Sequence, residues 1–425
     1  MMEYKKPSGI TPRIIIHGGA GNITPANLSP SEHAQFHDSL LSILAQTHHF
    51  LTSPSSFPLC SGSSTSALDA ATFAVSLLEN NPLFNSGHGA VFTRDGINEL
   101  EASIMVSKGK KKRGTGVMGL TRVKNPIKLA REMLLHGEED LYGEDPNYTS
   151  RGAQGHSQLH RYSAEKLAKE WGMEMVDPSY YFTQERWDQH IQGLKKEKVG
   201  GVSTWDAESF FPQGTCGAVA LDAEGVVCTA TSTGGPALVL SETLKGLMAD
   251  CFPSLTAYSP IPHCESNMGM FVNRDRIFRA TGMSGTGNGD SFLRINAVRT
   301  ISAIARYSSP SGKVTLKDAL AKVTGRDGDL QKSAGDRWQK TGEGEGGVIG
   351  IEVTAVTDAN SAYKSATSEC LDDFNCGGMF RAAVNKRGKA VMRVWRPGQH
   401  GGLEKYEGEG KEYDLGELLD EKMLL

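Results

Sequence analysis

The sequence has few cysteines for its length, and none are arranged as a close pair. Seven cysteines are scattered over 425 residues, and no Cys-x-x-Cys spacing occurs. This pattern is typical of reduced thiols in an intracellular compartment, not of a disulfide framework or a zinc site. The twelve histidines show no HExxH spacing, so a histidine-based metal site is not predicted either.

Long hydrophobic runs and an excess of one charge are also missing. No window approaches the roughly 18 apolar residues that cross a bilayer, and no apolar stretch follows the basic residues near the start. We therefore expect a cytoplasmic protein without a secretory signal or membrane partner. The 45 Lys and Arg residues nearly balance 49 Asp and Glu residues, for a net charge of −4. A nucleic-acid partner held by a broad basic field is thus not predicted.

The familiar catalytic motifs are absent as well. The segment at 282–286 (GMSGT) has threonine where a serine nucleophile elbow needs its last glycine, and there is no Walker loop. A glycine loop at 285–289 precedes a predicted helix that Asp290 would cap. Such a loop could hold an anion at the helix N-terminus, but it lacks the full spacing of a dinucleotide site. The alternative is a tight turn from strand to helix.

Apolar periodicity and turn residues predict a mixture of strands and helices. Glycine is abundant, at 49 residues, which indicates many tight turns. Strands are expected at 13–16 and in hairpins at 215–231 and 379–395, and helices at 66–78, 162–171 and 290–304. We expect 187–213 to be a mobile connector. The polar segment 308–346 is expected to be a surface insertion, and 398–425 a peripheral tail.

The segment Gly-Thr-Cys-Gly at 214–217 opens a strand of small residues. A threonine hydroxyl is a poor nucleophile unless a base lies beside it. If the chain is cut before Thr215, its own α-amino group, with a pKa of about 7.7–8.0, becomes that base. Gly214 suits such a cut, because glycine adopts strained backbone conformations without a steric penalty. The alternative interpretation is that this pair simply starts a strand.

Four blocks of sequence, one of which contains Gly214 and Thr215, can be compared with known families. They are IIIHGGAGN at 14–22, the run from LLENNPLFNSGHG to ELEASIM at 77–105, GTCGAVALDAEGVVCTATSTGG at 214–235 and GTGNGDSFLRIN at 285–296. In this order they resemble the plant-type L-asparaginase and isoaspartyl peptidase family, a branch of the N-terminal nucleophile hydrolases that includes glycosylasparaginase and taspase. Shorter matches at 123–132 and 374–384 support the resemblance.

The resemblance implies an α+β fold, a four-layer αββα sandwich. It also implies a precursor that cuts itself between Gly214 and Thr215, giving an α chain of 1–214 and a β chain of 215–425 within one domain. Thr215 would then attack the side-chain amide of L-asparagine, or the isopeptide bond of a β-aspartyl peptide. A β-aspartyl ester would form, and water would release L-aspartate.

The other site residues are likewise implied by the resemblance. Thr233 matches the threonine that bonds the nucleophile, and Thr286 and Gly287 match the donors of the oxyanion hole. Gly289 matches a glycine of the substrate pocket, and Asn85 an asparagine that supports the site. No cofactor is expected beyond a structural sodium ion, which the family holds with main-chain carbonyls. The matching positions are Leu78, Glu79, Asn81, Phe84, Ser86 and His88.

The resemblance breaks after the block that ends at residue 235. The family continues with an arginine that clamps the substrate α-carboxylate and an aspartate that holds its α-ammonium. The chain has Thr243 and Gly246 at those positions. Two accounts remain open: a genuinely divergent region, or a local reading-frame or splice error.

Three functions follow from these observations. The first is a self-processing amidohydrolase that acts on a small molecule or dipeptide as a dimer of αβ heterodimers, as in the family. The second is a non-catalytic or impaired member, because the carboxylate clamp is missing. The third is a threonine endopeptidase similar to taspase, in which the segments at 236–265 and 308–346 would reshape the cleft.

Overall fold

The strands form two sheets in the computed structural model, which describes residues 9–53, 65–107, 113–139, 156–198, 214–235, 255–258, 276–307, 314–357 and 363–419. Within these residues, one sheet has nine strands, in the order β13 (Glu412–Tyr413), β12 (Ala390–Arg393), β11 (Gly378–Val384), β1 (Arg13–Gly21), β5 (Cys216–Leu221), β6 (Val227–Thr233), β2 (Leu100–Val106), β3 (Arg113–Leu120) and β4 (Gln158–His160). The other has four, in the order β10 (Tyr363–Phe374), β9 (Gly346–Thr357), β8 (Arg276–Gly287) and β7 (Leu255–Tyr258). All neighbouring strands are antiparallel except β3 and β4.

The helices connect and cover these strands. The α-helices are α1 (Pro30–Thr52), α2 (Ala67–Glu79), α3 (Pro126–Glu139), α4 (Arg161–Glu170), α5 (Gln184–Lys198), α7 (Gly289–Ile295), α8 (Ala297–Tyr307), α9 (Leu316–Thr324) and α10 (Asp329–Lys332). Short 3-10 turns occur at η2 (Pro178–Tyr181), η4 (Gly335–Arg337), η5 (Leu403–Lys405) and η6 (Leu415–Leu418).

Local sequence signals explain where the first two helices begin. Ser29 caps α1 in a capping box with Glu32, and Pro30 occupies the first turn, where its missing N–H costs nothing. Ser66 caps α2 by accepting a hydrogen bond from the main-chain N–H of Asp69. The helix predicted at 66–78 is therefore confirmed, with Ser66 as its cap.

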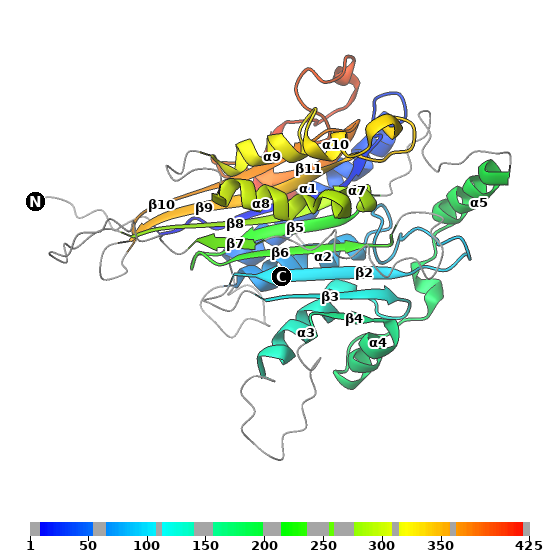
Figure 1. Ribbon diagram of the computed structural model, residues 1–425, viewed down its shortest axis with the longest axis horizontal. Helices are drawn as coiled ribbons and strands as arrows, with labels where there is room; N and C mark the ends of the chain where they lie inside the picture. The colour runs from blue at the N-terminus through cyan, green and yellow to red at the C-terminus, as the bar shows by residue number, and fades with distance from the viewer. Residues whose placement is uncertain are drawn as a thin grey trace, which may run out of the picture.

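Three apolar clusters order the elements in space. The largest lies between the nine-stranded sheet and the helices α1, α2 and α3. The second, which includes Ile15, Val219 and Ile351, joins the two sheets face to face. The third packs α7, α8 and α9 on the outer face of the four-stranded sheet. Figure 1 shows α8 and α9 over β8–β10, and α3 at the opposite side of the molecule. The prediction of a mixed α and β fold is confirmed.

The connector and the insertion expected from the sequence differ from the structure. Residues 187–198 of the expected connector belong to α5, which begins at Gln184, while 199–213 lie outside the described residues. Residues 314–346 are not a surface insertion, because Leu316, Leu320 and Val323 of α9 are buried in the third cluster. These side chains recur every three or four residues, so they line one face of a short helix.

The glycine loop and helix near 290 also differ from expectation. Gly285 and Gly287 belong to the end of β8, and the cap of α7 is Asn288, not Asp290. Asn288 accepts a hydrogen bond from the main-chain N–H of Ser291, 3.0 Å away. Asn296 then adopts a left-handed conformation, with φ +50°, which separates α7 from α8.

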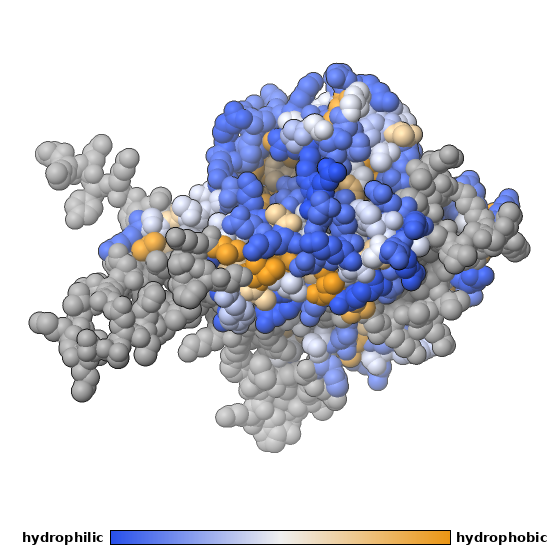
Figure 2. All heavy atoms as spheres, turned by 45° about the horizontal axis from the view of Figure 1, so that its top comes forward, coloured by the Kyte–Doolittle hydropathy of each residue, from blue (hydrophilic) through white to orange (hydrophobic). Residues whose placement is uncertain are grey.

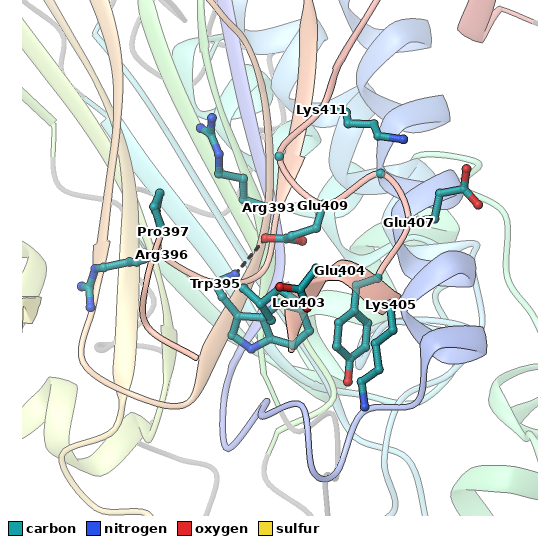
Figure 3. A pocket seen from close by; sticks show the side chains of 13 residues that line it. Arg393, Trp395, Arg396, Pro397, Leu403, Glu404, Lys405, Glu407, Glu409 and Lys411 are labelled. Carbon is teal, nitrogen blue, oxygen red and sulfur yellow. Dashed lines mark hydrogen bonds between the residues drawn. The ribbon is translucent and has the colours of Figure 1, made fainter. Parts of the chain in front are cut away.

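The C-terminal segment is packed against the body of the protein and is not peripheral up to residue 419. The Tyr406 hydroxyl donates to the main-chain oxygens of Pro25 (3.0 Å) and Leu28 (2.9 Å). Glu409 accepts from the main-chain N–H of Trp395, 3.1 Å away, beside a pocket of about 760 Å³ (Figure 3). Residues 420–425 of the expected tail lie outside the described residues.

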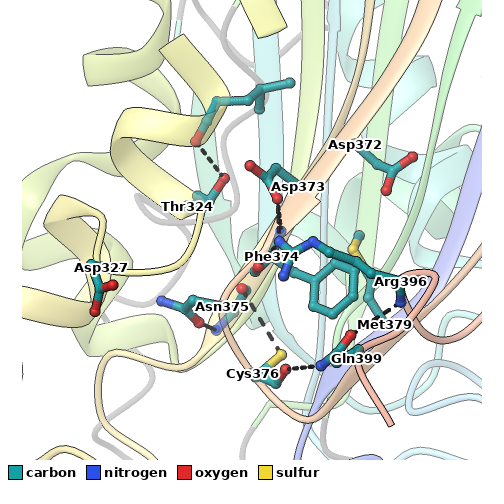
Figure 4. A network of polar contacts seen from close by, with 12 residues as sticks. Thr324, Asp327, Asp372, Asp373, Phe374, Asn375, Cys376, Met379, Arg396 and Gln399 are labelled. Carbon is teal, nitrogen blue, oxygen red and sulfur yellow. Dashed lines mark hydrogen bonds and ion pairs between the residues drawn. The ribbon is translucent and has the colours of Figure 1, made fainter. Parts of the chain in front are cut away.

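A polar network fixes the corner between β10 and β11. The Arg396 guanidinium lies 4.1 Å from the centre of the Phe374 ring and pairs with Asp373 (Figure 4). Gln399 donates to the carbonyl of Cys376 at 3.1 Å. These contacts join both sheets at a corner and serve the fold.

The outer surface is mainly hydrophilic on the face shown in Figure 2, where hydrophobic residues gather in one group near the centre. Within the described ranges, no helix is both long and apolar enough to span a membrane.

Candidate active site

Thr215 lies directly before β5, between β1 and β6 of the nine-stranded sheet. Cys216 pairs with Ser232 in the β5–β6 register, so Thr215 lies level with Thr233 at the end of β6. Thr215 exposes only 6% of its surface, and Thr233 likewise 6%. The sequence thus brings these two predicted threonines to the same end of the sheet.

The chain around Gly214 is too crowded for any side chain. A Cβ atom on Gly214 would lie 2.5 Å from the Cα atom of Gly19 and 2.6 Å from the nitrogen of Ala20. Gly19 itself has a φ of +125°, in a region that L side chains rarely adopt. The glycines of the HGGAG segment therefore let one stretch of main chain pass closely over the Gly214–Thr215 junction.

The alternation of side chains along β5 shows which way Thr215 faces. Cys216, Ala218 and Ala220 lie in the core on the helix side, and Val219 lies in the core between the sheets. Because successive strand residues point to opposite faces, Thr215 faces the four-stranded sheet.

Thr286 lies at the same level on the opposing sheet. A Cβ atom on Gly282 would meet Val219 at 3.3 Å, and a Cβ atom on Gly217 would meet the Ser284 hydroxyl at 2.3 Å. Thr215 lies two residues before Gly217 on β5, and Thr286 lies two residues after Ser284 on β8, so Thr286 comes opposite Thr215. Thr286 is 2% exposed, and its hydroxyl has no hydrogen-bond partner in the described part of the chain.

Gly287 and Gly289 follow Thr286 at the end of β8. Gly287 has a φ of +141°, and a Cβ atom there would lie 2.4 Å from the main-chain oxygen of Glu345. Only glycine fits this position, which leaves the backbone accessible next to Thr286. Gly289 is the first residue of α7.

A chain of buried polar groups lies beneath this end of the two sheets. The Ser284 hydroxyl is 2.8 Å from His17 Nε2 and 2.8 Å from the Thr231 hydroxyl. Burial lowers the pKa of His17 to about 3, and a hydrogen bond with the main chain of Thr215 opposes this shift. The imidazole is therefore neutral, and it connects β1, β8 and the start of β5.

Asn85 ties its loop to the end of β6. Its side-chain amide donates to the Gly235 oxygen at 2.9 Å, and its Oδ1 accepts from the Val91 N–H at 3.0 Å. Its main-chain oxygen accepts from the N–H of Gly234 at 3.0 Å. Asn85 is fully buried, so these bonds fix the turn that follows Thr233.

Glu79 anchors the same loop through a well-satisfied carboxylate. It accepts from the Ser232 hydroxyl (2.7 Å), the Ile127 N–H (2.9 Å) and the Asn125 amide (3.0 Å). Burial raises the pKa of Glu79 to about 7, and these three donors oppose the shift. Ser86 joins this network, because its hydroxyl lies 2.6 Å from that of Ser232.

Arg186 on α5 holds the other side of the loop. Its guanidinium donates to the main-chain oxygens of Gly89 and Leu83, each at 2.9 Å, and the residue is 3% exposed. Burial lowers the pKa of Arg186 to about 10. The helix α5, which was not predicted from the sequence, thus supplies a buried cation that restrains the loop of Asn85.

Main-chain oxygens lie close to two glycines of this loop. A Cβ atom on Gly87 would lie 2.3 Å from the Glu79 oxygen, and one on Gly89 would lie 2.4 Å from the Pro82 oxygen and 2.8 Å from the Phe84 oxygen. The Glu79 oxygen accepts from the His88 N–H at 2.7 Å, and the Phe84 oxygen accepts from the Ser86 N–H at 2.9 Å. No group of three His, Cys, Asp or Glu side chains that could hold a metal ion occurs in the described ranges.

Several residues at this end of the sheets were not predicted from the sequence. They are His17, Ser284, Thr231, Glu101 and Arg186. The alternation of Thr229, Thr231 and Thr233 was a usable signal, because three hydroxyls on one face of a strand are unusual in a core. The positions Thr243 and Gly246 lie outside the described residues.

Comparisons with known proteins show which family the chain belongs to. The family described as asparaginase matches residues 10–241. A putative isoaspartyl peptidase/L-asparaginase of Dictyostelium discoideum is 31% identical over 73% of this chain and 82% of its own length. The chain belongs to the asparaginase family.

Bacterial and plant proteins extend this relationship. The isoaspartyl peptidase of Escherichia coli is 32% identical over 73% of this chain and 80% of its own length. A probable isoaspartyl peptidase/L-asparaginase 2 of Arabidopsis thaliana is 27% identical over 90% of this chain and 98% of its own. This asparaginase-family chain therefore matches its relatives over most of their length.

Proposed function

We propose that this protein is a self-processing threonine amidohydrolase. It cleaves the side-chain amide of L-asparagine and the isopeptide bond of β-aspartyl peptides, and releases L-aspartate. The observation that carries the proposal is the meeting of Thr215, Thr233 and Thr286 at one end of two packed sheets, directly after Gly214. The names of the bacterial and plant relatives support the substrate class.

Maturation begins with an attack within the chain. The Thr215 hydroxyl adds to the carbonyl carbon of Gly214, and the peptide bond gives way to an ester. Water then hydrolyses this ester, which leaves a carboxylate on Gly214 and a free α-amine on Thr215. The close passage of Gly19 supports this step, because it holds the scissile junction in a defined conformation.

In turnover, the same hydroxyl attacks the substrate. The α-amine of Thr215 accepts the hydroxyl proton, and the oxygen bonds to the amide carbon. Negative charge develops on the substrate oxygen. The donors for it are the main-chain N–H of Gly287 and the Thr286 hydroxyl, which has no partner within the described ranges. Ammonia or an amine leaves with a proton. Water then cleaves the β-aspartyl ester and restores the threonine.

Other properties extend the proposal. The packing of helices and sheets supports a four-layer αββα sandwich, the fold of N-terminal nucleophile hydrolases. The loop at 78–88 would hold a structural sodium ion through its carbonyl oxygens. We further propose a cytoplasmic dimer of αβ heterodimers. The unbridged thiols of Cys216, Cys228, Cys370 and Cys376 support a reducing compartment.

Gel electrophoresis and an ammonia assay test this proposal together. Wild-type protein should separate into chains of 1–214 and 215–425, and the Thr215→Ala variant should remain one band. The cleaved protein should release ammonia from L-asparagine and aspartate from a β-aspartyl dipeptide. Cleavage without turnover of either substrate would instead favour the non-catalytic alternative, and an intact wild-type chain would contradict maturation.

A further inference from the structure

Glu101 on β2 is a buried carboxyl group with no partner among the described residues. The residue exposes 0% of its surface, and neither carboxyl oxygen has a hydrogen-bond partner in the part of the chain that the structure describes. Its neighbours Leu100 and Ala102 lie in the core on the helix side. Glu101 therefore points from the opposite face, toward the four-stranded sheet.

This face also carries the nucleophile. Glu101 pairs with Thr233 in the β2–β6 register, and Thr215 lies level with Thr233 on the next strand. The three residues form a row across adjacent strands. At about 4.8 Å between strands, the Cα atoms of Thr215 and Glu101 are roughly 10 Å apart. Only the small side chain of Thr233 lies between them in the row.

A buried carboxyl group with no hydrogen-bond donor among the described residues is stabilised by a bound cation. Burial raises the pKa of Glu101 to about 8, and the nearby carboxyl of Glu99 adds to the shift. The Arg161 guanidinium opposes the rise in the pKa of Glu99. Glu79, in contrast, is just as buried but accepts three hydrogen bonds. Burying a carboxylate without a partner costs free energy, whereas an ammonium group bound to the carboxylate offsets that cost.

We propose that Glu101 binds the α-ammonium group of the substrate while Thr215 attacks its side-chain carbonyl. The assignment rests on the proposed function and adds the residue that recognises the amine. L-Asparagine and β-aspartyl peptides both carry a free α-ammonium at a fixed separation from the bond that is cleaved. A row with a nucleophile at one end and an anion at the other suits this class of substrate. It also supplies a negative charge that the positions Thr243 and Gly246 do not.

The test compares two amides that differ only in this amine. L-Asparagine carries the α-ammonium, and succinamate is the same amide without it. In the Glu101→Gln variant, kcat/KM for L-asparagine should fall about 10- to 100-fold, mainly through KM, because a charge-assisted bond is lost. The value for succinamate should stay unchanged. Glu99→Gln is the matched control, and it should leave both values near those of the wild type.

Each outcome has a distinct meaning. An equal loss for both amides would overturn the proposal, because Glu101 would then act on the nucleophile or the fold. An equal loss in Glu99→Gln, or no loss in Glu101→Gln, would overturn it as well. Self-cleavage on a gel confirms that each variant folds. If Glu101→Gln does not fold, Glu101→Asp, which keeps the charge, is measured with the same two amides in its place.

A binding measurement separates this proposal from the proposed function. If wild-type protein is cleaved but hydrolyses neither amide, the proposed function fails. Calorimetry with L-aspartate and succinate still tests Glu101 in that case. Wild-type protein should bind L-aspartate more tightly than succinate, and Glu101→Gln should lose the difference. If wild-type protein and Glu101→Gln prefer L-aspartate over succinate to the same extent, the role of Glu101 is refuted.

Discussion

Replacing Glu101 with glutamine should stabilise the protein at high pH, although it removes a buried side chain of the proposed site. The pKa of Glu101 rises from 4.5 to about 8 on folding. At 1.36 kcal/mol for each pH unit, full ionisation in the fold costs on the order of 5 kcal/mol as an upper limit. Relaxation of the surroundings reduces this cost, so we expect a gain of about 2–5 kcal/mol for Glu101→Gln at pH 9.

The direction of the pH dependence follows from proton binding. Below about pH 4.5 the carboxyl is protonated in both states, and its ionisation costs nothing. Between pH 4.5 and about 8 the folded state holds a proton that the unfolded state has lost, so stability falls as the pH rises. Above pH 8 both states are ionised and the whole penalty is present. Glutamine does not titrate, so its advantage should be small at pH 5 and largest at pH 9.

Urea unfolding of the uncut chain measures this effect most directly. Thr215→Ala, with and without Glu101→Gln, is compared at pH 5 and pH 9 without substrate and at one protein concentration, because association shifts apparent stability. The difference between the two free energies of unfolding isolates Glu101 from all other titrating groups. A difference that is the same at both pH values would refute the reasoning, since the carboxyl would then have a partner.

Three further substitutions probe the surrounding contacts. Glu79→Gln should lower the free energy of unfolding in urea by about 1–3 kcal/mol, because an amide NH₂ would face the Ser232 and Ile127 donors. A higher free energy of unfolding would contradict the hydrogen-bond network. Arg186→Leu should lower stability by about 2–4 kcal/mol by leaving two carbonyls without donors, and an unchanged unfolding midpoint would count against the clamp. Thr286→Ala should lower kcat for L-asparagine about 10²–10³-fold, and unaltered steady-state kinetics would remove its hydroxyl from the oxyanion site.

Much of the fold could be predicted from the sequence because the signals are local. The strand at 13–16, the helix after Ser66 and the hairpin at 379–395 were all predicted and are present, although the first strand continues through HGGAG to Gly21. α5 and α9 were missed because the surrounding segments are polar on average. Within α9, only one face is apolar, and a helix of nine residues shows this pattern over little more than two turns.

The site could be predicted only in part. The sequence identifies Thr215, Thr233 and Thr286 through their motifs, yet their common level depends on how the two sheets face each other. That arrangement follows from packing between β5 and β8, which are far apart in sequence. The role of Glu101 could not be predicted for the same reason. Within ELEAS it is one acidic residue among several, and its burial depends on β6 and the opposing sheet.

Glu79 and Glu101 show how the fold distinguishes a structural carboxylate from a functional one. Both are buried near the same end of β6, and burial raises the pKa of each. Glu79 accepts from donors on β6, on α3 and at Asn125 just before α3, and so can be explained by stability alone. Glu101 has no donor among the residues that the structure describes. A core that satisfies one carboxylate with three hydrogen bonds had the means to satisfy or replace the other. A buried carboxylate that costs stability and lies in one row with the nucleophile is best explained by a ligand that completes it.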